Sequence, residues 1–208
     1  MKGFALASRT PASWAPAALA DPAALLSDHA HCELKAAASG MALLRRQGGR
    51  AGLVARLAPL VREEFDHFQR VLRELAAHGW ELQPDRPSPY SRALLAAAGA
   101  PRRREDGALD ALLVAALIEM RSHERFVRLL ECEAAAPLHA LFAPLAEAEE
   151  RHGETFLELA LELAPEEQVR TRFAALARAE AEALAGAPAG PRVHSGPPDR
   201  PVFPGRTA

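Results

Sequence analysis

Two copies of a Glu-x-x-His motif are the residues of this sequence best suited to metal chemistry. Glu64 and His67 end the segment P-L-V-R-E-E-F-D-H, and Glu149 and His152 belong to P-L-A-E-A-E-E-R-H, so both segments read P-L-x-x-x-E-x-x-H. Residues three apart on an α-helix project from the same side. Each motif can therefore offer one carboxylate and one imidazole to a metal ion, and the repeat predicts two similar half-sites.

A further glutamate precedes each motif at nearly the same distance, Glu33 before Glu64 and Glu119 before Glu149. Four glutamates and two histidines, facing inward from four helices, are the ligand set of bundles that hold two iron or manganese ions. Four carboxylates neutralise two divalent cations, whereas their burial without metal would be costly. The predicted ligands are Glu33, Glu64, His67, Glu119, Glu149 and His152.

All six residues fall on the apolar stripe of a predicted helix. The neighbouring Glu63 and Glu147 instead have charged residues around them and are expected to face water. The apolar neighbours, three to seven residues away, include Leu57, Leu60 and Val71 for the first motif, Leu145 and Phe156 for the second, Leu26 and Ala30 for Glu33, and Leu112 and Phe126 for Glu119.

Taken singly, these residues have plainer interpretations. Glu33 alone fits a half-exposed boundary position, and a lone His67 or His152 fits a hydrogen-bonded core histidine. His29 and His123 lie four residues from Glu33 and Glu119. We expect them to support the ligands by hydrogen bonds or to be core residues.

The ligand chemistry narrows the choice of metal. Carboxylates and imidazoles without thiolate suit iron or manganese and argue against structural zinc. The sequence does not separate iron from manganese. Cys32 and Cys132 are expected to be small core residues.

Helices must position these residues, because Ala, Leu, Glu and Arg dominate while Val, Ile and Thr total only 13 of 208 residues. The fold class is predicted to be all-α. Asp21 and Pro22 fit an N-cap and a first-turn proline, while Pro59 and Pro144 are expected to kink their helices or mark late starts. Helices are expected over 21–47, 52–78, 106–135, 137–164 and 165–185, with a short one near 91–98.

The links between these helices predict the topology. Short links favour antiparallel pairs, and the long connection over 79–105 can cross the whole bundle. The expected architecture is a ferritin-like four-helix bundle with a long crossover between its second and third helices and an additional C-terminal helix. We expect an N-terminal arm over 1–20, the helical domain over 21–185, and a Pro/Gly-rich tail over 186–208 that is flexible or lies on the surface.

Composition excludes several classes of protein. A hydrophobic share of 49% is too high for a disordered chain, and a net charge of -2 excludes a globally basic nucleic-acid binder but not a local basic patch. No apolar run approaches the roughly 20 residues of a membrane span, and the N-terminal apolar stretch is too short for a secretory signal. With two distant cysteines, we expect a cytoplasmic protein, without a membrane partner, that is a monomer or a small oligomer.

The phrases around the predicted ligands resemble a known family. The stretches LLSDHAHCELKAA at 25–37, REEFDHF at 62–68, ALIEMRSHERF at 116–126 and AEERH at 148–152 are similar to the bacterial tRNA hydroxylases acting on 2-methylthio-N6-isopentenyl-adenosine. The likeness covers about residues 14–185, and RVHSG at 192–196 adds a weaker match. His123 stands where this family pattern leads us to expect a smaller residue such as Cys.

The resemblance implies a ferritin-like, non-haem di-iron monooxygenase. It would hydroxylate the isopentenyl group of the modified adenosine next to the tRNA anticodon, using O₂ and two electrons from a reductase. The six predicted ligands would then bind two irons, with Glu64 and Glu149 as the bridging carboxylates.

Several arginines are candidates for contacts with tRNA phosphates. Solvated helix ends and partners for nearby glutamates explain any one of them equally well. The candidates are Arg45, Arg46, Arg50 and Arg56 around the first loop, Arg102, Arg103 and Arg104 in the crossover, and Arg121, Arg125 and Arg128 on the third bundle helix.

Three other functions stay open at the level of sequence. One is a ferritin-like di-iron oxidase or peroxidase acting on a small molecule, and another is an iron-storage or ferroxidase protein. The third is a metal-free helical interaction protein, which would have to bury six ionisable side chains without metal.

Overall fold

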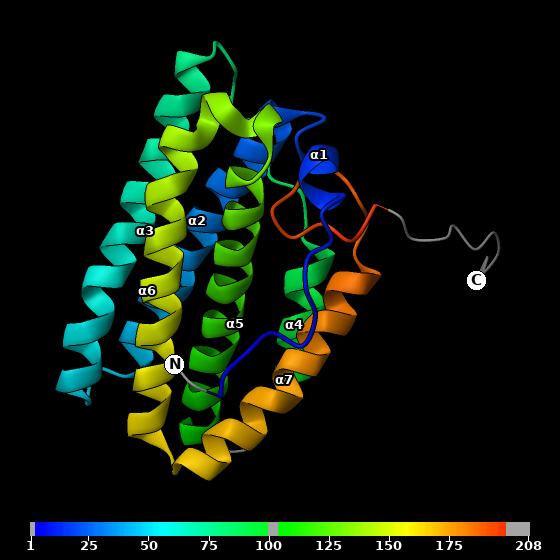
Figure 1. The fold of residues 1–208 in the computed structure, drawn as a ribbon. Coiled ribbons are helices and arrows are strands. Elements are labelled where there is room, and N and C mark those ends of the chain that lie inside the picture. The colour runs from blue at the N-terminus through cyan, green and yellow to red at the C-terminus, as the bar shows by residue number, and fades with distance from the viewer. Residues whose placement is uncertain (1–2, 100–103, 199–208) are drawn as a thin grey trace.

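The computed structural model describes residues 3–99 and 104–198, the side chains of 104–106 excepted. In this part of the chain there are seven α-helices and no strand. Four long helices form the bundle: α2 (Pro22–Arg46), α3 (Ala51–Ala77), α5 (Arg104–Leu130) and α6 (His139–Leu163). They lie side by side in Figure 1, with the pairs α2–α3 and α5–α6 most closely packed. The predicted ferritin-like bundle is confirmed.

The remaining elements flank this bundle. The crossover between α3 and α5 contains α4 (Pro89–Ala98), which packs against α7 (Glu166–Gly186) on one side of the bundle (Figure 1). A short helix, α1 (Trp14–Ala18), precedes α2, and a 3-10 helix, η1 (Glu133–Leu138), precedes α6. Within the described residues no single helix has the length and apolarity of a membrane span, and only α5 with η1–α6, bent by 113°, meets that test as a pair.

Helix boundaries follow local chemistry. The Asp21 side chain accepts a hydrogen bond of 2.9 Å from the backbone N–H of Ala24, which caps α2 at its predicted start. Ser88 caps α4 in the same way, from the N–H of Ser91 at 3.2 Å. Both caps are followed by proline at the first helical position, where the missing N–H costs nothing.

One of the two alternatives expected for Pro59 and Pro144, a kink or a late helix start, needs correction. Neither Pro59 nor Pro144 marks a late start, because α3 and α6 begin earlier and continue through them. The adjacent Leu60 and Leu145 are buried in the core, and this burial helps to offset the backbone hydrogen bond lost at each proline. The third bundle helix, expected to reach residue 135, ends at Leu130, because the chain becomes extended at Cys132.

Residues 187–196 also differ from the expectation of a flexible or surface tail over 186–208, while 199–208 lie outside the described residues. After α7 the chain turns back toward α1 and α2 (Figure 1), and Val193, His194 and Ser195 are buried. The Arg125 guanidinium donates to the carbonyls of Val193 and Ser195, the latter at 2.8 Å. We call residues 187–196 the C-terminal strap.

Two apolar clusters divide the bundle along its length. One contains Leu57, Leu112 and Phe156, and the other contains Leu26, Val71, Phe126 and Phe142. On each of the four long helices, a predicted metal ligand falls between residues of the two clusters. The ligands therefore form a buried polar layer between two apolar layers.

Candidate metal centre and substrate cavity

The six predicted ligands are all buried, with 1–7% of each residue exposed. Each bundle helix supplies what its sequence predicts: α2 carries Glu33, α3 carries Glu64 and His67, α5 carries Glu119, and α6 carries Glu149 and His152. The half-exposed alternative for Glu33 is wrong, since this residue is 3% exposed.

Five of the six side chains meet in two overlapping groups. Glu33, Glu64 and His67 form one group, and Glu64, Glu119 and His152 form the other, with the nearest oxygen and nitrogen atoms of each group within 4.8 Å of one another. Glu64 belongs to both groups. Glu149 is in neither, although its carboxyl adjoins that of Glu119.

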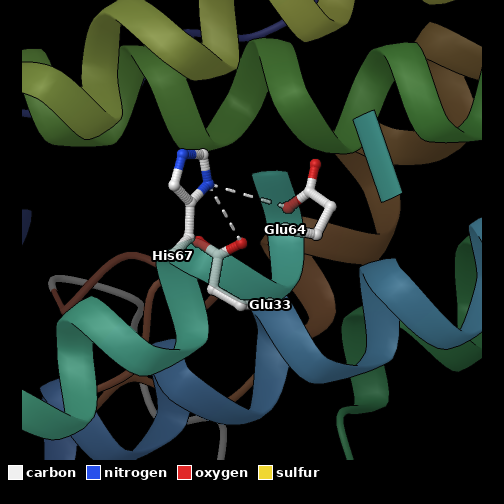
Figure 2. Close-up of side chains that lie close together, drawn as sticks. All are labelled: Glu33, Glu64 and His67. Atoms are coloured by element: carbon white, nitrogen blue, oxygen red, sulfur yellow. Dashed lines mark ion pairs between the residues drawn. The ribbon is translucent and has the colours of Figure 1, made fainter. Parts of the chain in front are cut away.

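The distances from His67 to the two carboxylates of the first group fit ligands that surround an ion rather than a histidine that hydrogen-bonds to them. In Figure 2, the His67 ring points toward both carboxylates, with Nδ1 3.7 Å from Glu33 Oε2 and 3.9 Å from Glu64 Oε2. These separations are too long for hydrogen bonds.

Unpartnered atoms support a metal more directly. Among the described residues, six buried side-chain N or O atoms lack a hydrogen-bond partner. Five of them belong to this site: both Glu64 oxygens, Nδ1 of His67 and of His152, and Nε2 of His29. Glu64 Oε1 and His152 Nδ1 lie 2.8 Å apart, and His29 Nε2 lies 3.0 Å from Glu33 Oε1, but neither contact has the geometry of a hydrogen bond. Buried polar atoms are almost always satisfied, so the cluster of exceptions fits an arrangement of donor atoms around metal ions.

The pKa values of the carboxyl groups in the metal-free site also favour the binding of cations. Burial, together with neighbouring carboxyl groups, raises the pKa of Glu33, Glu119 and Glu149 well above the usual range. Burial also opposes ionisation of Glu64, but the adjacent His152 outweighs it and lowers the Glu64 pKa. Ionisation of these three buried carboxyls is therefore unfavourable without metal, and divalent cations would offset its cost.

The two motif histidines have opposite environments, although their rings stack with centroids 5.6 Å apart. Burial lowers the pKa of His67. For His152 burial acts in the same sense, but Glu64, with Oε1 2.8 Å from Nδ1, outweighs it and raises the pKa to about 9.

One supporting residue was missed by sequence reasoning. Glu63 was expected to face water, and its side chain is 37% exposed, yet its Oε2 lies 2.7 Å from His152 Nε2. Arg151 Nη2 contacts the same oxygen at 3.4 Å. A carboxylate on the outer ring nitrogen fixes which nitrogen of a ligand histidine faces the metal. The signal in the sequence that could have identified Glu63 is its position directly before Glu64.

The other two histidines behave differently from each other. His29 is buried with Nε2 3.0 Å from Glu33 Oε1, as expected for a residue that supports a ligand. Burial lowers the pKa of His29 to about 3. His123 instead bonds through Nδ1 to the Ala146 carbonyl at 2.8 Å, a contact between α5 and α6.

A cavity of about 810 Å³ connects this site with the exterior. Buried Glu64 and Glu119 line it, as do exposed residues of α2 and of the crossover. Aliphatic and aromatic side chains from α2, α3, α5 and α6 make up much of its wall, among them Leu43, Leu57, Leu60, Val114, Ile118 and Phe156. The C-terminal strap and the crossover complete it.

The arginine candidates separate into distinct groups. Arg121 and Arg125 are buried, and Arg121 pairs with buried Glu180 at 2.9 Å, so neither faces solvent as a phosphate contact would require. Arg56 and Arg128 lie in ion pairs with glutamates. Arg45 and Arg46 are exposed at the end of α2, and Arg50 is half-exposed. Arg102 and Arg103, and the side chain of Arg104, lie outside the described residues.

The chain is similar to known proteins over nearly its whole length. A curated tRNA 2-(methylsulfanyl)-N6-isopentenyladenosine(37) hydroxylase of Pseudomonas putida KT2440 is 34% identical over 191 residues, covering 91% of each chain. A solved structure, Protein 43 with aldehyde deformylating oxygenase activity from Synechococcus, superposes with a TM-score of 0.86 and 38% identity, over 92% of this chain and 96% of that one. The family model of the tRNA-(MS2IO6A)-hydroxylases (MiaE) matches residues 2–195, and the chain therefore belongs to this family.

Proposed function

We propose that this protein is an O₂-dependent monooxygenase that hydroxylates the isopentenyl group of 2-methylthio-N6-isopentenyl-adenosine in tRNA. The observation that carries the proposal is the cavity, which leads from exposed residues to Glu64 and Glu119 between aliphatic side chains. Family membership and the Pseudomonas relative supply the substrate class.

The proposed metal ligands are the six buried residues of the polar layer, and the proposed metal is iron, with manganese as the alternative. Glu64 is the first choice for a bridging carboxylate because it belongs to both ligand groups. Glu149 is proposed as the second bridge, because it shares a helix turn with His152. A bound iron pair would supply the activation of O₂.

The side chains that line the cavity favour an apolar substrate group. Leu57, Leu60 and Ile118 offer an apolar surface for a branched five-carbon group, and they keep water away from the carboxylates. A volume of about 810 Å³ is in the range of pockets that enclose whole small ligands. The modified base would have to leave its stack to enter, as for other enzymes that act on a base.

The stoichiometry of the proposed hydroxylation defines which partners the protein needs. One atom of O₂ enters a C–H bond to give the alcohol, and the other is reduced to water by two electrons and two protons. The two electrons must be supplied again at every turnover, so a separate reductase is proposed as the electron donor. We propose that the protein works in the cytoplasm, where its tRNA substrate is found.

A second candidate function has a specific observation behind it. The Synechococcus protein carries aldehyde deformylating oxygenase activity at 38% identity to this chain. The same aliphatic cavity could take the hydrocarbon chain of an aldehyde.

The two functions are separated by giving the iron-loaded protein each substrate with a chemical reductant and O₂. Our proposal predicts a hydroxylated nucleoside in digests of tRNA that carries the isopentenyl modification, and little turnover of a long-chain aldehyde. Formate release from the aldehyde, with unchanged tRNA nucleosides, would instead favour the second function.

A further inference from the structure

Apart from Asp28, which is half-buried beside Arg192, the charged residues that line the cavity are sorted by depth. The acidic Glu64 and Glu119 are buried at the metal site. Most basic lining residues are exposed: Lys35 and Arg46 on α2 and Arg86 in the crossover. Arg192 of the strap, whose side chain is 26% exposed, is the fourth. An acidic floor thus lies beneath a basic rim.

We infer that these four side chains, the basic rim, bind the phosphate backbone of the RNA whose modified base enters the cavity. The inference rests on the proposed function and adds the surface through which the tRNA is held. Phosphate contacts fix the position of a nucleic acid, while the base itself is recognised elsewhere. A rim around the cavity mouth would place a loop base directly above the metal site.

Contacts between three chain segments give the rim a defined shape. Lys35 Nζ lies 2.6 Å from Asp85 in the crossover, and Arg192 Nη1 donates to the Pro87 carbonyl at 3.0 Å. Arg192 Nε also lies 3.8 Å from Asp28. Lys35 and Arg192 each lie beside a carboxylate, Asp85 and Asp28, and these contacts hold the two cations at the mouth of the cavity.

The spread of the rim favours a polyanion over a single phosphate. Lys35 and Arg46 are separated along α2 by about 16 Å, at 1.5 Å per residue. One phosphate group cannot contact both positions, whereas successive phosphates of an RNA loop can. An acidic protein partner would also fit the charge, but it would not need cations that line the cavity leading to Glu64.

The test is RNA binding by the iron-loaded full chain carrying Arg46→Glu and Arg86→Glu together. Affinity for a fluorescent anticodon stem-loop with the isopentenyl modification is measured by anisotropy between 50 and 200 mM salt. We expect affinity at low salt to fall at least about tenfold. The slope of log K against log salt should decrease by roughly 0.7–0.9 for each lost phosphate contact.

A matched control keeps the same change in net charge. Arg73→Glu with Arg178→Glu alters two exposed arginines, on α3 and α7, that do not line the cavity. This variant should bind RNA almost as the unmodified protein does. Iron content and the thermal unfolding midpoint serve as folding checks, and Arg86→Ala replaces the double variant if that variant fails them.

Unchanged affinity in the rim variant, or an equal loss in the control, would overturn the inference and move the RNA surface elsewhere. If the rim variant lost binding to an acidic protein but kept its binding to RNA, the inference would also be overturned. The proposed function fails separately: rim-dependent RNA binding without any hydroxylated nucleoside from the unmodified protein would uphold the surface and reject the activity.

Discussion

At the scale of single residues, Glu64 is the most informative position because its carboxylate belongs to both ligand groups. Glu64→Ala should abolish binding of paired metal while the bundle stays folded, since removing a buried carboxyl also removes repulsion from Glu33 and Glu119. Glu149→Ala should have the same effect. Metal content per chain and circular dichroism measure both consequences.

Glu147→Ala is the control for this pair, because Glu147 is exposed on the same helix as Glu149. It should retain the metal content of the unmodified protein. Two irons per chain in either ligand variant would refute the assignment of that ligand.

Glu63 should act by holding the His152 ring. Glu63→Gln weakens the charge-assisted contact at Nε2, and metal affinity is expected to fall about 10- to 100-fold. Competition with a chelator measures this affinity directly. Glu150→Gln, at an exposed position directly after Glu149, is the control; equal affinities in the two variants would reduce Glu63 to a surface residue.

These residues also mark how far sequence reasoning reached. Helical periodicity placed the six ligand candidates on buried faces, because apolar neighbours recur at one and two turns. It did not find Glu63, whose own helix turns are charged and whose partner His152 comes from another helix. It also could not choose among the arginines, because the pairing of Arg121 with Glu180 joins distant parts of the chain.

At the scale of elements, the long helices were predicted to within a few residues, because caps, prolines and glycines signal their ends locally. The exception was the end of α5, where a 3-10 helix replaces a predicted α-helical turn. The strap was not predicted, because its burial depends on Arg125, Trp14 and Asp28, which lie far from it in sequence.

The strap gives a prediction at this scale. A Cβ at Gly196 would lie 2.0 Å from the Ala187 carbonyl oxygen, a backbone atom that cannot yield easily. Gly196→Ala should therefore displace the strap and destabilise the protein by about 1–3 kcal/mol. Gly186→Ala, where nothing lies within 4 Å of the added atom, is the matched control. Unchanged unfolding and protease resistance in Gly196→Ala would contradict the packing described here.

At the scale of the whole molecule, the metal-free protein should lose stability as pH rises from about 6.5 to 9. The pKa of His152 is raised to about 9 from an ordinary 6.5, and those of Glu33, Glu119 and Glu149 are raised from 4.5. Groups with raised pKa stabilise the fold below their unfolded pKa and lose that contribution as pH passes the folded value. The pKa of His29 is lowered to about 3, so this group reduces the stability of the fold only below pH 6.5.

The His152 shift alone corresponds to at most about 3 kcal/mol. Thermal unfolding of chelator-treated and iron-loaded protein across this pH range tests the prediction. Bound metal stabilises the ionised carboxylates, so the loaded protein should lose much less. A metal-free midpoint that stays level or rises toward pH 9 would contradict the account of the site.

The central claim is that this buried site inserts an oxygen atom from O₂ into the isopentenyl group of a tRNA nucleoside. The most direct test is mass spectrometry of nucleosides after reaction of the reduced, iron-loaded protein with modified tRNA under ¹⁸O₂. We predict a hydroxylated nucleoside whose added oxygen carries the ¹⁸O label, and none from Glu64→Ala. A product whose oxygen comes from water, or no product from protein that holds two irons per chain, would contradict the claim.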